Sequence, residues 1–223
     1  MSKAYLIAGL GADPRIYKHI VLQGFEIMTV EWLTPDESDT LTSYAQKLID
    51  QYSIENNSVV VGNSLGGMLA IEIAKKVSLE KVILISSIKT IYEAPPYFKL
   101  FRALPLYKII PGRLFTSMVF LIEPLFGKMS DEDRWLFRDM LKKTSSVFLR
   151  WAMGACVKWD NKIIPPDTFQ ISGEKDLVFP LRYIKNTVVV KGGSHVMIFD
   201  KADEINKILK SILENETSPV VLS

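Results

Sequence analysis

The sequence lacks the features that mark several classes of protein. Cys156 is its single cysteine, which excludes an intramolecular disulfide and suits a reducing cytoplasm. Lysine and arginine (27) nearly balance aspartate and glutamate (25), so the charge gives no reason to expect a nucleic-acid partner. The N-terminus shows no signal-peptide pattern, and the longest apolar stretch, around residues 118–122, is too short to span a bilayer. We therefore expect a cytoplasmic protein without stable membrane insertion; the oligomeric state stays open.

Short apolar runs do occur, and they alternate with segments in which apolar residues recur every three or four positions. The first pattern is typical of buried strands and the second of helices packed on a sheet. We predict strands at residues 4–8, 25–32, 58–61, 81–85, 167–172 and 187–190, and helices at residues 41–52, 68–77 and 201–214. This alternation predicts a single α/β domain over residues 1–223, with a mainly parallel six-stranded sheet flanked by helices.

One region interrupts the alternation. Residues 88–160 carry no good strand pattern, are rich in aromatic residues and are punctuated by prolines. Several short helices, inserted between the fourth and fifth strands, fit this composition best. Such an insertion would lie over the carboxyl ends of the strands, where open α/β sheets bind ligands. We therefore predict that residues 88–160 form a helical lid.

The motif G-x-S-x-G stands between a predicted strand and a predicted helix. Gly62 and Gly66 would allow the two elements to approach closely, and the sharp turn would lift the Ser64 hydroxyl clear of the sheet. A serine that merely caps the helix is the alternative. The flanking strand and helix favour a nucleophile, because that context is what gives the motif its meaning.

A serine nucleophile needs a base, and the chain offers two histidines. His19 lies in a predicted first helix, which Asp13 and Pro14 begin, and we expect it at the surface. His195 follows the sixth predicted strand in a glycine-rich loop, at the same edge of the sheet as Ser64. We therefore predict His195 as the base.

The base in turn needs an orienting carboxylate. Asp176 follows the fifth predicted strand and falls at the carboxyl edge, whereas Asp167 precedes that strand. Glu174 is a nearby competitor and Glu93 a more distant one. Asp176 is our choice, although a turn residue that bonds its own backbone is an alternative for it.

An oxyanion hole needs two backbone donors near the nucleophile. The N–H of Leu65, directly after Ser64, is the first candidate. The second is the N–H of Leu10, in the glycine turn after the first predicted strand. An ordinary glycine turn is the alternative for Leu10.

Together these motifs resemble, in order and spacing, the α/β-hydrolase superfamily. The resemblance covers residues 4 to about 213 and rests on Gly9-Leu10-Gly11, Gly62-Asn63-Ser64-Leu65-Gly66-Gly67, Gly173-Glu174-Lys175-Asp176 and Gly193-Ser194-His195. It implies a Ser64–His195–Asp176 triad, an oxyanion hole from the amides of Leu10 and Leu65, and no cofactor or metal.

Two departures from the superfamily pattern concern the beginning of the chain. Ala8-Gly9 replaces the His-Gly pair that usually opens the oxyanion loop, so a side chain that often braces this loop is missing. The given sequence also begins at the strand before the oxyanion loop, so we expect a compact, six-stranded version of the fold that lacks the two N-terminal strands of the full family sheet.

If some aromatic residues of the predicted lid line the pocket, they favour a small-molecule substrate with an apolar acyl or aromatic group. For most of them, the interpretation that we favour is that they pack the lid helices on the core. Basic residues at positions 89–113 are best explained as a solvated helix face, although an anionic substrate or a membrane surface would also suit them. Arg15, beside the oxyanion loop, would bind a substrate carboxylate or serve at the surface of the helix start.

The sequence thus predicts a serine hydrolase that cleaves a small carboxylic ester or thioester through an acyl-enzyme. An acyltransferase, a lyase or a carbon–carbon bond hydrolase would use the same residues. A ligand-binding or scaffold protein that keeps the fold without turnover is the alternative from another class.

Overall fold

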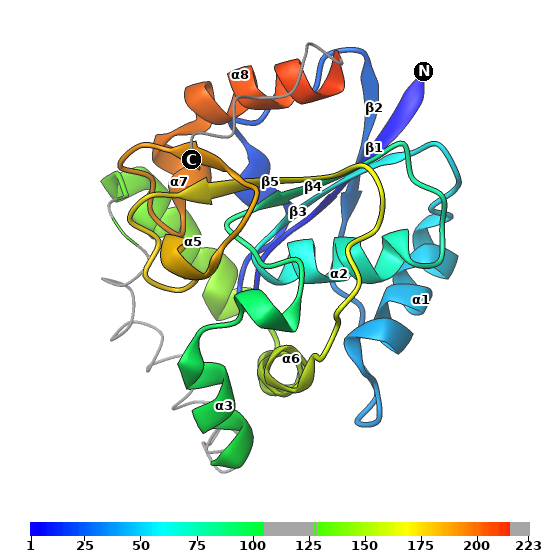
Figure 1. Ribbon diagram of the computed structural model, residues 1–223, viewed down its shortest axis with the longest axis vertical. Coiled ribbons are helices and arrows are strands. Elements are labelled where there is room, and N and C mark those ends of the chain that lie inside the picture. Colours follow the sequence, from blue (N-terminus) through cyan, green and yellow to red (C-terminus); the bar gives the residue numbers. More distant parts are fainter. Residues whose placement is uncertain (105–126, 128, 215–223) are drawn as a thin grey trace.

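The centre of the fold is a parallel β-sheet. The structure, a computed structural model, describes residues 1–104, 127 and 129–214. In this part of the chain, six parallel strands form one sheet in the order β2-β1-β3-β4-β5-β6 (Figure 1). The strands are β1 (Ser2–Ile7), β2 (Phe25–Val30), β3 (Val59–Asn63), β4 (Lys81–Ile85), β5 (Thr168–Gly173) and β6 (Val188–Val190). The predicted class and the parallel six-stranded sheet are confirmed.

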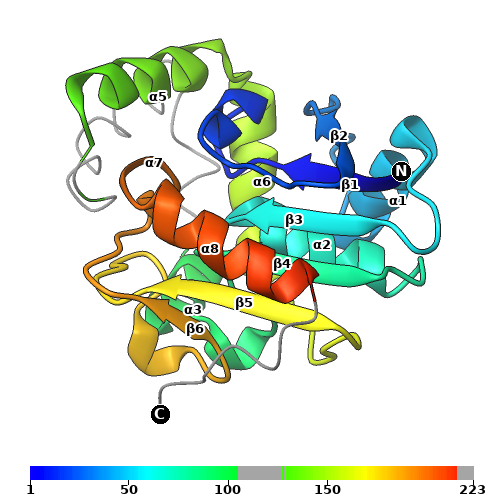
Figure 2. The same cartoon turned by 90° about the horizontal axis from the view of Figure 1, so that it is seen from above.

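Helices cover both faces of the sheet (Figure 1, Figure 2). Apolar residues of one face pack against α1 (Leu41–Tyr52), α2 (Leu65–Ala74) and α6 (Ser146–Lys158). Residues of the other face pack against α8 (Ala202–Leu213), α5 (Asp131–Lys143), the short helix α7 (Met197–Asp200) and the 3-10 helix η1 (Pro14–Tyr17). Within the described residues, each helix is too short or too polar to cross a membrane.

The central strands contribute side chains to both apolar cores, because successive side chains point to opposite faces of the sheet. In β1, Tyr5 and Ile7 face α1 and α2, whereas Ala4 and Leu6 face α8 and η1. All four are buried, which explains why the strand reads as a continuous apolar run rather than an alternating one. Because the strands are parallel, their carboxyl ends meet at one edge, where Ile7 of β1 pairs with Gly62 of β3.

The described residues between β4 and β5 form helices and turns. They contain α3 (Pro96–Ala103), α5, α6 and the 3-10 helix η2 (Ile91–Glu93), and a further 3-10 helix, η4 (Leu181–Tyr183), follows β5. The tail at 216–223 lies outside the described residues. So do seven aromatic, methionine and basic residues of the predicted lid: Tyr107, Lys108, Arg113, Phe115, Met118, Phe120 and Phe126.

The interpretation of the basic residues as a solvated face is wrong for Lys89, whereas Lys99 and Arg102 of α3 are exposed, as that interpretation expects. Lys89 is buried, and its ammonium group pairs with Glu93 at 3.3 Å and donates to backbone carbonyls at 185 and 186. Burial lowers the pKa of Lys89. The guanidinium of Arg102 donates to the carbonyl of Val157 at 2.7 Å and so ties α3 to the end of α6. Both cations therefore hold the inserted region together.

Beyond β2, the backbone is bonded to two tyrosines of α1. The hydroxyl of Tyr52 donates to the carbonyl of Glu31 at 3.0 Å and accepts the N–H of the same residue at 2.9 Å. Tyr44 makes the equivalent pair of bonds to Leu33, at 2.9 and 2.8 Å. Both polar groups of each of these backbone residues are thereby satisfied.

A buried carboxylate joins three parts of the fold. Glu72 of α2 is 1% exposed and accepts hydrogen bonds from Thr42 of α1 at 2.7 Å and from the indole of Trp159 at 2.8 Å. Lys75, one turn further along α2, pairs with it at 2.8 Å. Such a group stabilises the fold only while its partners remain.

We predict that Glu72→Ala lowers the free energy of unfolding by about 3 kcal/mol, because it leaves the buried indole N–H of Trp159 without an acceptor. Urea unfolding of the variant and the wild type measures the difference. Glu204→Ala, at an exposed position of α8, is the matched control and should change the stability by less than about 0.5 kcal/mol. A loss no larger than that of the control would contradict the role of Glu72.

Candidate active site

Ser64 occupies a strained turn between β3 and α2. Its backbone has φ 52° and ψ −115°, a combination that non-glycine residues rarely adopt. A Cβ atom on Gly66 would lie 2.0 Å from the carbonyl oxygen of Ile7, and one on Gly62 would lie 2.2 Å from the carbonyl oxygen of Gly66. Glycine is therefore required on both sides of Ser64, as the motif predicted.

Hydrogen bonds hold the strained serine in place. Its N–H donates to the carbonyl of Ile85 at 3.0 Å, and its carbonyl accepts the N–H of Gly67 at 3.0 Å. The same carbonyl accepts the hydroxyl of the buried Ser87 at 2.6 Å. These bonds come from β4, from the residues that follow it and from α2, so the turn is fixed by the core rather than by local preference.

The structure brings Ser64, His195 and Asp176 together at the carboxyl edge of the sheet. His195 lies between β6 and α7, and its Nε2 is 3.1 Å from the Ser64 hydroxyl. Its Nδ1 lies 2.9 Å from Oδ2 of Asp176, which follows β5. His195 and Asp176 are buried, whereas Ser64 is partly exposed. This arrangement allows the imidazole to accept the serine proton while the carboxylate fixes its orientation.

Asp176 combines the two roles considered for it. Its Oδ1 accepts the N–H groups of Val178 and Phe179, each at 2.8 Å, as a turn-forming aspartate does. Its Oδ2 meanwhile remains turned toward His195. The ring of Phe179 lies 5.6 Å from the imidazole, edge to face. The turn therefore fixes both the carboxylate and one side of the His195 imidazole.

The competing groups lie elsewhere. The exposed Glu174 accepts the N–H of Gly192, Glu93 is paired with Lys89, and Asp167 precedes β5. His19 is exposed as expected, but it lies in the turn after η1 rather than in a helix, because the 3-10 helix ends at Tyr17.

Arg15, which was considered for a substrate carboxylate, and Cys156, the single cysteine, lie outside this hydrogen-bonded arrangement. Arg15 pairs with Asp13 and with Asp139, each at 2.7 Å, which joins η1 to α5 and matches the surface interpretation. Burial raises the pKa of the Cys156 thiol to about 12, so it is protonated at neutral pH and is a poor nucleophile.

The predicted oxyanion loop lies directly beside Ser64. A Cβ atom on Gly9 would be 3.1 Å from Cβ of Ser64, and the N–H of Ala12 donates to the carbonyl of Gly9 at 3.1 Å to close the turn. Leu10 lies within this turn, and Leu65 is the first residue of α2, where a backbone N–H has no acceptor in its own helix. Leu65 is thus adjacent to Ser64 in the chain, and Leu10 belongs to a turn that packs beside Ser64.

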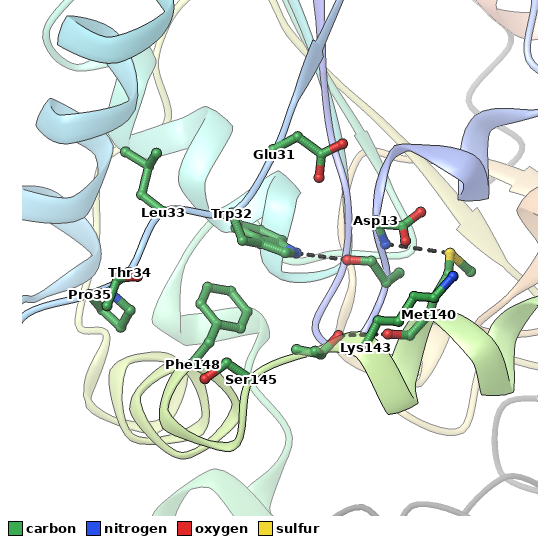
Figure 3. Close-up of a pocket in the computed structure, with 12 residues that line it drawn as sticks. Asp13, Glu31, Trp32, Leu33, Thr34, Pro35, Met140, Lys143, Ser145 and Phe148 are labelled. Carbon is green, nitrogen blue, oxygen red and sulfur yellow. Dashed lines mark hydrogen bonds between the residues drawn. The ribbon is translucent and has the colours of Figure 1, made fainter.

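Three residues around the site were missed by the sequence analysis: Trp32, Ser87 and Phe179. Ser87 and Phe179 contact Ser64 and His195 as described above. Trp32 donates its indole N–H to the carbonyl of Ala12 at 2.7 Å (Figure 3). Position was the one sequence feature that could have identified these residues, since all three come after strands, at the carboxyl edge of the sheet. Among the described residues, no cluster of three or more His, Cys, Asp and Glu side chains is arranged to hold a metal ion.

Comparisons with solved structures show where this architecture recurs. An esterase from Exiguobacterium antarcticum aligns with a TM-score of 0.76 at 18% identity, covering 96% of this chain and 92% of that one. MenH from S. aureus aligns at 0.72 and 18%, with 97% and 95% covered, and a bromoperoxidase from Bacillus anthracis at 0.69 and 20%, with 96% and 92% covered. At these identities the likeness shows the fold.

Comparison at the level of sequence gives the family. A search of curated proteins found no match. The family model described as "Alpha/beta hydrolase family" matches residues 5–208, which is most of the chain and includes every candidate site residue. The resemblance that the motifs carried is confirmed: the chain belongs to the alpha/beta hydrolase family.

Proposed function

We propose that this hydrolase is a serine hydrolase that cleaves small carboxylic esters or thioesters. The observation that carries the proposal is the continuous hydrogen-bonded series from Ser64 through His195 to Asp176, at 3.1 and 2.9 Å. A scaffold or ligand-binding protein has no use for these three side chains in this order, whereas acyl transfer requires them. We further propose that the enzyme works in the cytoplasm.

In the proposed reaction, the Ser64 hydroxyl oxygen attacks the substrate carbonyl carbon while its proton passes to Nε2 of His195. The tetrahedral intermediate collapses, and the leaving alcohol or thiol takes that proton. Water then gives a proton to His195 and attacks the acyl-serine; as the carboxylic acid leaves, His195 returns that proton to the Ser64 oxygen, which restores both residues. Asp176 stays ionised throughout and stabilises the imidazolium.

The negative charge that forms on the carbonyl oxygen needs donors that are already in place. We assign this role to the backbone N–H groups of Leu10 and Leu65. Among the described residues, no acceptor bonds either N–H, so both are available to a substrate. The close packing of Gly9 on Ser64 supports the assignment, because it brings the loop that contains Leu10 next to the nucleophile.

The inserted helices are proposed to act as a lid and to favour an apolar acyl or aromatic group. Leu10 packs against a small apolar cluster formed by Leu141 of α5 and Leu149 of α6, so the oxyanion loop faces an apolar surface of these helices. On the other side of the site, the ring of Phe98 in α3 lies 6.1 Å from that of Phe179. Helices of residues 88–160 thus flank both the proposed oxyanion hole and the base.

We predict that a fluorophosphonate probe labels Ser64, because the probe reacts with serines activated by a base. Mass spectrometry should find one adduct on the wild type and none on Ser64→Ala. Ser78→Ala, an exposed serine in the turn after α2, is the control and should keep the adduct. A folded wild-type protein that stays unlabelled would overturn the proposal. A panel of esters, thioesters and 1,3-diketones would then separate ester, thioester and carbon–carbon bond cleavage.

Asp176→Asn should lower kcat about 10³- to 10⁴-fold, since the amide would turn an N–H toward Nδ1 and favour the wrong imidazole tautomer. Its carbonyl oxygen can still accept the N–H groups of Val178 and Phe179, so the turn should persist. Steady-state kinetics on an activated ester measures the loss, and circular dichroism checks the fold. Glu174→Gln is the matched control; an equal loss in both variants would remove Asp176 from the proposed triad.

A further inference from the structure

We propose that Trp32 is a positioning residue that braces the oxyanion loop through the carbonyl of Ala12. The inference rests on the proposed function, because it concerns the backbone donor at Leu10. The indole Nε1 donates to the Ala12 oxygen at 2.7 Å, and Figure 3 shows the ring directed at that carbonyl. Ala8-Gly9 offers no polar side chain at the start of the loop, so the brace comes from a distant part of the sequence.

The bond fixes the far end of the turn that contains Leu10. The N–H of Ala12 closes this turn on the carbonyl of Gly9, and Gly9 in turn lies against the backbone and side chain of residues 63 and 64. The near end of the turn is therefore anchored on the nucleophile and the far end on Trp32. Leu10 lies between these two anchors, so its N–H direction depends on both.

The next peptide group is held from both sides. The carbonyl of Ala12 accepts the Trp32 indole, while the N–H of Asp13 donates to the sulfur of Met140 at 3.4 Å. A thioether is a weak acceptor, so the indole makes the stronger of the two bonds. Rotation of this peptide would break both bonds and turn the loop away from Ser64.

Trp32 is itself well fixed. It lies two residues after the end of β2, and Tyr44 binds both backbone polar groups of the next residue, Leu33. The Trp32 ring lies 4.6 Å from the ring of Phe148 in α6 and 6.4 Å from that of Tyr44. A donor on a rigid support loses little entropy when it bonds, which suits a residue that must hold another group in position.

The ring also borders a cavity of about 280 Å³ between the core and the α5–α6 junction (Figure 3). Phe148, Met140 and Pro35 contribute apolar walls, and the cavity reaches Ala12 and Asp13 of the loop. Removal of the indole would enlarge this cavity next to the Ala12 carbonyl. A free indole molecule added to such a variant would fit there, with its N–H facing the same oxygen.

The first test is Trp32→Phe, which keeps an aromatic ring and removes the N–H. We expect kcat for an activated ester to fall about tenfold while KM stays within about twofold, because the transition state alone needs the oxyanion donors. The affinity for phenylboronic acid, which forms a tetrahedral adduct with the serine, should fall by a similar factor. Trp151→Phe is the matched control, since its indole donates to the carbonyl of Asp39 at 2.9 Å, and it should change neither quantity by more than about twofold.

The second test is chemical rescue of Trp32→Gly. Indole should restore activity, whereas benzofuran, which has the same bicyclic shape without an N–H donor, should not. Equal rescue by both compounds, or a Trp32→Phe loss no greater than that of Trp151→Phe, would overturn the inference.

Hydrogen exchange separates failure of this inference from failure of the proposed function. The amide of Ala12 should exchange faster in Trp32→Phe than in the wild type or Trp151→Phe, whether or not the esters are turned over. A wild type that neither hydrolyses esters nor takes up the fluorophosphonate would refute the serine hydrolase. An unchanged Ala12 amide would refute the brace.

Discussion

The site depends on one close contact, the approach of α2 to the end of β1. Gly66 lies so near the carbonyl of Ile7 that any side chain there would collide with it. This approach forces the sharp turn at Ser64, and the bonds from Ile85, Gly67 and Ser87 keep the strained backbone from relaxing. Strain of this kind persists only where the surrounding structure determines it several times over. Ser64 is thus positioned by packing at the carboxyl edge of the sheet.

The other site residues reach this edge by the same topological route. Parallel strands end side by side, so residues that follow β5 and β6 lie near one that follows β3, although they are more than a hundred positions apart in the chain. Asp176, held by its own turn, and His195, next to the ring of Phe179, need little rearrangement to act on Ser64. Such preorganisation reduces the reorganisation required during a reaction.

Much of the fold and of the candidate site could be predicted from the sequence, because the residues that determine them form local patterns. Strand and helix periods gave the sheet, and Gly62, Gly66 and the loop of His195 carry motifs whose meaning depends only on neighbouring elements. The roles of Trp32 and Ser87 were not accessible, since both donate to backbone carbonyls that distant packing brings near them. The prediction that Lys89 lies on a solvated helix face was wrong for a similar reason, because a local sequence does not reveal that an ammonium group is buried.

The two tyrosines of α1 also bear on how copies of this chain can associate. Residues two apart on an extended segment present their backbone groups to the same side, and a free edge of that kind invites pairing with another chain. At Glu31 and Leu33 the hydroxyls of Tyr52 and Tyr44 occupy these groups as a neighbouring strand would. The segment beyond β2 is therefore closed to strand addition, and the protection comes from side chains of a helix that also packs the core.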